Sequence, residues 1–180
     1  MIMTVTGYKS FEMGIHQDSD PRIDYVKHAL KQKIVTFIEQ GGQWVLTSGQ
    51  LGVELWAVEV VLDLQVDYQV QVAIIPPFDH QDARWNEANQ EKYQHLTEMV
   101  DYYQLLYQGD YKNPGQFKAK NKFFLDKSDV SLILVDDINP GSVKYYLDEA
   151  KRYQKANKQM LEFITPLDLD DVVRELTEDF

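Results

Sequence analysis

The run VSLILV, from Val130 to Val135, decides the fold class of this chain. An almost unbroken apolar run of this length is typical of a β-strand that is covered on both faces. Other segments of strand type occur before and after it, and they are separated by segments whose apolar residues recur at helical spacing. Strands that alternate with helices predict a parallel sheet between two helical layers. We therefore predict an α/β fold, a three-layer sandwich with a mainly parallel sheet.

The predicted elements follow one another along the whole chain. Asp20 and Pro21 have the pattern of an N-cap and a first helical position, and paired glycines at 41–42 end that helix. No internal repeat or linker interrupts the series, so we expect one domain over residues 1–180. The expected strands are 2–6, 43–47, 69–75, 102–107, 130–135 and 160–164, and the expected helices are 21–40, 51–66, 86–99, 116–127, 142–157 and a short one from 166.

Composition narrows the class of protein. The chain has 180 residues, no cysteine and a formal net charge of −11. The lack of cysteine excludes disulfides and thiol chemistry and fits a reducing cytoplasm, where we expect the protein to act. The first residues do not resemble a signal peptide, and no apolar run approaches the ~18 residues that a membrane span needs. The negative charge disfavours a broad nucleic-acid surface, which requires clustered Lys and Arg.

Three glycine-containing loops follow predicted strands. They begin at Gly7, at Ser48 and at Asp136, and the third of them reaches a helix start at Gly141 and Ser142. The carboxyl ends of parallel strands meet at one edge of a sheet, and ligands bind outside that edge. We therefore expect these loops to line one pocket.

The loop TSGQLGVE, residues 47–54, has the clearest pattern of a binding loop. Gly49 and Gly52 leave backbone N–H groups uncovered before a helix start, where the helix dipole favours an anion, and Ser48 adds a hydroxyl. The pattern is neither G-x-G-x-x-G nor a P-loop, and turn chemistry alone would also explain it. Glu54 would repel a nearby phosphate but would accept hydrogen bonds from ribose. We therefore expect a nucleotide or phosphorylated sugar, with its phosphate on the backbone and its sugar near Glu54.

The other two loops give weaker signals. Tyr8 could stack on a base and Lys9 could neutralise a phosphate, although both residue types are also common on surfaces. Asp136, with Asp137, could bind ribose or a metal, although Asp is also an ordinary turn former. The turn at Gly141 and Ser142 is a second candidate anion cradle.

Two further features have alternative interpretations. Trp85 lies in a loop before a predicted helix and is either a core plug or a lid that stacks on a base. The nearby DHQD, residues 79–82, lacks a second histidine, so no metal is predicted. Lysines gather within residues 112–127, either as a solvated helix face or as a local positive field over an anion site.

Taken together, several motifs resemble the YpsA-like family of Firmicutes. They are VTGYKSFEMGI, TSGQLGVELWAVEVV, IPPF, RWNEANQ, QFKAKNKFFLDKSDVSLILVDD and GSVKYY, in this order, from about residue 5 to 147. That family is similar to the SLOG superfamily, which includes the DNA-processing DprA/Smf proteins and the LOG phosphoribohydrolases. The resemblance implies a Rossmann-like fold, a bound nucleotide or derivative such as ADP-ribose, and a sensor or regulatory role linked to cell division or stress.

The resemblance transfers to individual residues unevenly. The family's glycine loop corresponds to residues 49–54, and the tryptophan of its NWNE element to Trp85. The F-x-x-R/K-N element corresponds to Phe117, Lys120 and Asn121. Lys stands where Arg is common, and Lys cannot make a bidentate fork to a phosphate. The phosphoribohydrolase loop G-G-x-G-T-x-x-E is not matched by INPGSVKYYLDE, so that activity is not implied.

Three functions remain open at the level of sequence. The first is a nucleotide-binding sensor, and the second is a hydrolase of an N-glycosidic or phosphate bond that uses Glu54. The third is a protein-interaction module without a ligand; a protein partner or a homo-oligomer fits any of the three. The candidate ligand-binding residues are Gly7, Tyr8, Lys9, Ser48, Gly49, Gln50, Gly52, Glu54, Trp85, Lys120, Asn121, Asp136, Gly141 and Ser142.

Overall fold

The computed structural model describes residues 1–178 and gathers their strands into one six-stranded sheet. The strand order is β4-β3-β2-β1-β5-β6, and every neighbouring pair is parallel. The predicted α/β fold with a mainly parallel sheet is therefore confirmed. The strands are β1 (Ile2–Gly7), β2 (Trp44–Thr47), β3 (Gln71–Ile74), β4 (Tyr102–Tyr103), β5 (Val130–Leu134) and β6 (Met160–Ile164).

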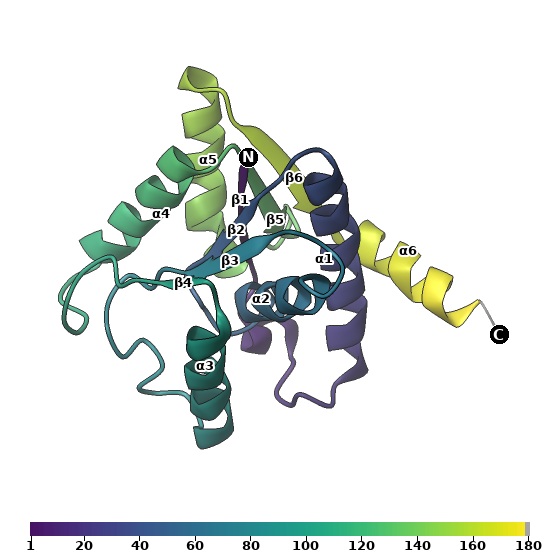
Figure 1. Ribbon diagram of the computed structural model, residues 1–180, viewed down its shortest axis with the longest axis horizontal. Helices are drawn as coiled ribbons and strands as arrows, with labels where there is room; N and C mark the ends of the chain where they lie inside the picture. Colours follow the sequence, from purple (N-terminus) through teal and green to yellow (C-terminus); the bar gives the residue numbers. More distant parts are fainter. Residues whose placement is uncertain (179–180) are drawn as a thin grey trace.

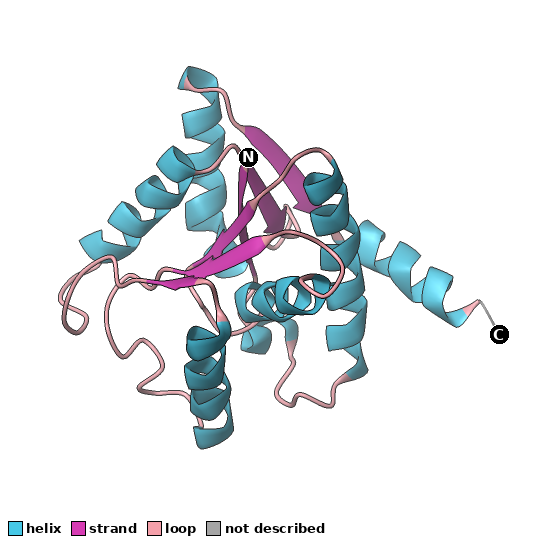
Figure 2. Ribbon diagram, viewed as in Figure 1, coloured by secondary structure: helices cyan, strands magenta, loops and turns pink. Residues whose placement is uncertain are grey.

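Helices cover both faces of this sheet. The sheet lies between α1 and α2 on one side and α4 and α5 on the other (Figure 1), and Figure 2 shows its magenta strands enclosed by cyan helices. The side chain of Asp20 accepts from the backbone N of Arg22 at 2.9 Å and caps α1, as its position before Pro21 predicts. The helices are α1 (Pro21–Glu39), α2 (Val53–Leu64), α3 (Glu87–Met99), α4 (Gly115–Lys127), α5 (Lys144–Ala156) and α6 (Pro166–Thr177), with short 3-10 turns η1 (Ser10–Met13) and η2 (Gly141–Val143).

Strand β5 lies between the two halves of the core. All of its residues are buried. Leu132 belongs to the cluster under α1 and α2, whereas Ile133 belongs to the cluster under α4 and α5. Successive side chains of a strand point to opposite faces, so only a continuous apolar run can serve both clusters.

Two segments differ from the sequence-based expectation. Strand β4 was expected over 102–107 but ends at Tyr103. Beyond Tyr103 the backbone N of Gln104 still donates to the Ile74 carbonyl. The next donors, Leu106 and Tyr107, bind the carbonyls of Pro76 and Pro77, which have no N–H to return. The loop expected after the first strand, from Gly7 to Asp20, contains the 3-10 turn η1.

The strand order reverses at β1. The chain passes from β1 to β2 on one side, and β5 pairs with β1 on the other. The loops that leave β1 and β5 therefore diverge and open a crevice at the carboxyl edge, where α/β folds bind ligands. Among residues 1–178, no helix is long and apolar enough to cross a membrane.

Candidate functional site

A cavity of about 520 Å³ occupies the crevice at the strand-order switch. Four segments form its wall: the end of β1, the start of α2, the first half of α4, and η2 with the start of α5. These segments come from both halves of the chain and meet at this edge of the sheet. The lining residues are Thr6, Gly7, Lys9, Gln50, Glu54, Pro114, Phe117, Lys118, Lys120, Asn121, Ser142, Val143, Tyr145, Tyr146 and Glu149.

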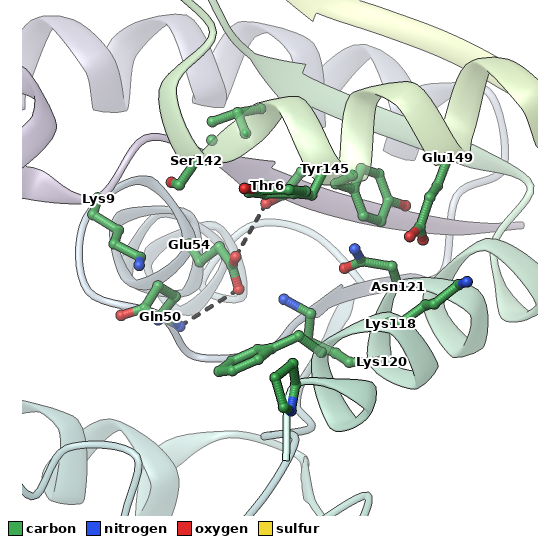
Figure 3. A pocket seen from close by; sticks show the side chains of 15 residues that line it. Thr6, Lys9, Gln50, Glu54, Lys118, Lys120, Asn121, Ser142, Tyr145 and Glu149 are labelled. Atoms are coloured by element: carbon green, nitrogen blue, oxygen red, sulfur yellow. Dashed lines mark hydrogen bonds between the residues drawn. The ribbon is translucent and has the colours of Figure 1, made fainter. Parts of the chain in front are cut away.

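Two ammonium groups reach into this cavity from opposite sides. Figure 3 shows the side chains of Lys9 and Lys120 extending toward the space in front of Glu54. Burial lowers the pKa of Lys120, the Glu54 carboxylate opposes this shift, and the charge on Lys9 adds to it. Among residues 1–178, Lys120 forms no hydrogen bond or ion pair, and its Nζ lies 5.9 Å from the centre of the Phe117 ring. The cavity therefore holds a positive charge that the described chain does not pair.

Glu54 is buried at the start of α2 and has a hydrogen-bond partner on each oxygen. Its Oε1 accepts from the backbone N of Ser48 at 2.8 Å, from the Ser48 hydroxyl at 2.6 Å and, at 3.5 Å, from the backbone N of Gln50. Its Oε2 accepts from the Thr6 hydroxyl at 3.1 Å. An ionised carboxylate offers about four acceptor positions, so Oε2 retains room for one donor from a ligand.

Asn121 adds an unsatisfied acceptor to the wall formed by α4. The residue is buried, and within residues 1–178 its Oδ1 has no hydrogen-bond partner. Buried polar atoms without a partner are rare and costly, so each one requires an explanation. Its position on the cavity wall beside Lys120 (Figure 3) makes a ligand or a water molecule the natural partner.

Local packing and backbone conformation require the two glycines of the loop after β2. A Cβ on Gly52 would lie 2.5 Å from the Ser10 backbone N and 2.6 Å from the Tyr8 carbonyl O. Gly52 and Gly49 also have φ values of 109° and 76°, which favour glycine. Two of the backbone amides in this loop already donate within the chain, from Ser48 to Glu54 and from Gly49 to the Thr47 hydroxyl. The chain's own carboxylate thus takes the place expected for a phosphate.

The second candidate cradle, at Gly141 and Ser142, is also filled by a carboxylate. Glu12 of η1 accepts from the Ser142 backbone N at 2.9 Å and from its hydroxyl at 2.6 Å. Burial favours the neutral acid, but the hydrogen bonds from Ser142 and from the Lys9 backbone hold the pKa of Glu12 below its usual value. Only the Ser142 side of this turn faces the cavity.

Tyr8 and Asp136 hold two loops together rather than lining the cavity. The Tyr8 hydroxyl accepts from the Asp136 backbone N at 2.8 Å and donates to the Asn139 carbonyl at 2.5 Å. The Asp136 carboxylate accepts from the Ile138 backbone N at 3.0 Å, which is the pattern of a turn former. The expected base stacking and ribose binding are therefore replaced, at these two residues, by loop-closing contacts.

Trp85 also lies away from the cavity. Its ring packs edge-on against Tyr93, with the ring centres 5.3 Å apart, and is half-buried against the core. It lines a separate hollow of about 380 Å³ together with Trp56 and Gly52. The placement corresponds to the core-plug alternative.

The structure brings half of the predicted binding residues into the cavity wall. The resemblance pointed to Phe117, and the lysine cluster included Lys118. The sequence analysis did not predict the other residues of the wall, which are Thr6, Pro114, Val143, Tyr145, Tyr146 and Glu149. Tyr145 and Glu149 lie four residues apart on α5, and this helical spacing was the available signal. The predicted residues in the wall are Gly7, Lys9, Gln50, Glu54, Lys120, Asn121 and Ser142; those outside it are Tyr8, Ser48, Gly49, Gly52, Trp85, Asp136 and Gly141.

Solved structures with a similar fold include a DNA-processing protein. The structure of DNA processing protein A from Helicobacter pylori, solved in a study of its single-stranded DNA binding mode, matches 100% of this chain and 81% of its own, with a TM-score of 0.57 and 15% identity. The X-ray structure of TM1055 matches 98% of each chain with a TM-score of 0.53 and 11% identity. At these identities the likeness concerns the fold alone.

Sequence comparisons identify much nearer relatives. The UPF0398 protein OB1025 of Oceanobacillus iheyensis is 46% identical over 176 residues, which cover 97% of this chain and 94% of that protein. A UPF0398 protein of Bacillus cereus is 42% identical over 175 residues, covering 97% and 95%. The sequence profile of the YpsA family, described as the YspA SLOG family, matches residues 3–169. The chain therefore belongs to the YpsA SLOG family, as its motifs predicted.

Proposed function

We propose that this protein binds a nucleotide or a nucleotide derivative, of the ADP-ribose type, in the cavity at the carboxyl edge of the sheet and acts as a sensor or regulator. The observation that carries the proposal is the unpaired, half-buried ammonium of Lys120 facing the Glu54 carboxylate across this cavity. The two groups together suit a ligand that is anionic at one end and rich in hydroxyl groups at the other. The SLOG relation supports the same class of ligand.

The geometry supports a particular orientation of that ligand. Both helix-start cradles are filled by Glu54 and Glu12, so the phosphate belongs beside Lys120 and Lys9. The free acceptor position on Glu54 suits a ribose hydroxyl. The exposed rings of Phe117 and Tyr145, on opposite walls, suit the faces of a base.

A binding experiment tests this proposal. Calorimetric titration of AMP, ADP-ribose, NAD and cyclic nucleotides should find at least one ligand, and Lys120→Met should weaken it by roughly 10- to 100-fold, since a hydrogen bond to a charged group contributes about 1.5–3 kcal/mol. Lys127→Met is the matched control, because Lys127 lies on the same helix outside the cavity. Equal effects of the two substitutions, or no binding across the panel at millimolar concentration, would refute the proposal.

A hydrolase is a second candidate, because Glu149 of α5 lines the same cavity as Glu54 of α2. Paired carboxylates can act as acid and base on a glycosidic bond. Incubation of each ligand with pure protein, followed by product analysis, separates binding from turnover. Turnover that Glu149→Gln abolishes while ligand binding persists would establish the enzyme.

Single-stranded DNA is a third candidate, which one observation supports and the net charge opposes. DNA processing protein A binds such DNA, and this cavity combines lysines with exposed aromatic rings, the pairing that single strands require. The net charge of −11 opposes it, so nucleic acid stays disfavoured. Titration of an oligothymidine at low salt, with and without the mononucleotide that binds most tightly, distinguishes the two ligands.

The cytoplasmic location expected from the sequence stays a prediction.

A further inference from the structure

A second groove adjoins the nucleotide cavity and runs outward between α4 and α5. It has a volume of about 590 Å³, and it shares Lys118 and Glu149 with the cavity. Figure 3 shows Lys118 extending away from Glu54, on the side where Glu149 lies. The lining residues are Gly115, Lys118, Ala119, Lys122, Leu125, Glu149, Arg152 and Tyr153.

Helical spacing explains why these residues face one another. Lys118 and Lys122 are four residues apart on α4, and Glu149 and Arg152 are three residues apart on α5. Residues at these spacings share one face of a helix. The two faces meet across the groove, and the apolar side chain of Leu125, which is buried, contributes to its floor.

The charge of the groove is opposite to that of the protein. Three cations and one carboxylate line it, in a chain of net charge −11. Lys122 pairs with Asp126 at 2.7 Å, whereas among residues 1–178 neither Lys118 nor Arg152 forms an ion pair. Cations that converge without partners in an acidic protein create a local field that attracts an anion.

We infer that this groove is a second anion subsite and that the ligand carries a further phosphate, joined to the one that lies at Lys120. The first phosphate lies at Lys120 in the cavity, and the second passes Lys118 and lies against Arg152. The ligand class is thus a nucleotide extended through a further phosphate, as in nucleoside diphosphate sugars and dinucleotides. This inference rests on the proposed function and narrows it to ligands longer than a mononucleotide. Arg152 is a specificity-determining residue in this arrangement, because its planar guanidinium can bind a phosphate through two hydrogen bonds.

The test compares a short and a long probe on matched variants. AMP and ADP-ribose are titrated calorimetrically into the wild type, Arg152→Glu and Lys151→Glu. The two substitutions change the net charge equally on adjacent exposed residues of α5, but only Arg152 lines the groove. We expect ADP-ribose to bind the wild type at least tenfold more tightly than AMP. Arg152→Glu should remove this advantage and leave AMP within about twofold, and Lys151→Glu should keep it.

Each other outcome overturns the inference in a recognisable way. If AMP binds but ADP-ribose binds no better, or if both substitutions act alike, the groove is no subsite and the proposed function stands. If neither probe binds and the wider nucleotide panel also fails, the proposed function falls with the inference. Thermal unfolding of each variant without ligand confirms that the folded state is retained.

Discussion

The carboxylate of Glu12 holds the backbone N and the hydroxyl of Ser142, which lies 130 residues further along the chain, at 2.9 and 2.6 Å. Glu54 holds the same two groups of Ser48 at 2.8 and 2.6 Å. In each case a carboxylate satisfies donors in a turn before a helix, where partial positive charge gathers. The carboxyl edge is therefore ordered by internal anions, and Lys118 and Lys120 of α4 remain for a ligand.

Replacement of Glu12 by Gln should reduce stability in a pH-dependent way. The pKa of Glu12 is below its usual value of 4.5, so the carboxylate stabilises the folded protein fully above that pH, and this contribution is lost as the pH falls through the lowered pKa. We expect Glu12→Gln to cost about 1 kcal/mol at pH 7, since solvent screens this half-buried group, and less at pH 4. Urea unfolding at both pH values measures it. Glu98→Gln, on the exposed face of α3, should be neutral, and a difference that grows toward low pH would contradict the assignment.

Replacement of Gly52 by Ala should destabilise the protein far more than the same change at Gly41. Both glycines have positive φ, 109° and 97°, so both substitutions carry a backbone penalty of about 1–2 kcal/mol. A Cβ at Gly41 meets nothing within 4 Å, but at Gly52 it meets the backbone of Ser10 at 2.5 Å. We expect Gly52→Ala to cost at least roughly 2 kcal/mol more, as in an overpacked core. Similar denaturation midpoints for the two variants would show that the η1 turn can move aside.

Glu54→Gln should lower the stability of the folded protein even without a ligand. Considered from the sequence alone, a first-turn carboxylate is expected to tolerate this change. In the structure, however, Gln would present an NH₂ group to donors on one side, at Ser48 or at Thr6. We expect a loss of about 2 kcal/mol and a lower melting temperature. Glu87→Gln at the exposed first turn of α3 is the control, and an unchanged midpoint for Glu54→Gln would refute this bonding.

Lys120 should make ligand binding sensitive to alkaline pH. Burial lowers its pKa from the usual 10.5, so the ammonium loses its proton at a lower pH than a solvated lysine does. AMP affinity should therefore fall as the pH rises through the lowered pKa, and Lys120→Arg should keep its affinity there. Without ligand, Lys120→Met should be at least as stable as the wild type at pH 7, because it removes a half-buried charge that lacks a partner. A pH profile of affinity identical in the wild type and Lys120→Arg would exclude this role.

The composition of its segments was enough to predict most of the framework. The run at 130–135 had to be a central strand, because a segment apolar on both faces is stable only between two helical layers. Parallel strand direction alone placed Gly7, Gln50 and Ser142 on one edge, and the structure places all three in one cavity. The end of β4 was less predictable, since it depends on Pro76 and Pro77, which follow the neighbouring strand β3.

Only the tertiary structure decided which anion binds the two helix-start turns at Ser48 and Ser142. A glycine turn before a helix attracts an anion, but the sequence does not say whether that anion is a ligand or a carboxylate of the same chain. The partner of Ser142 is Glu12, on a short turn that the sequence pattern did not reveal. Likewise, Glu149 and Lys118 meet at one groove only because α4 and α5 pack side by side on the sheet. Local patterns fix which groups a segment offers, whereas the long-range packing of segments fixes which of those groups are left for another molecule.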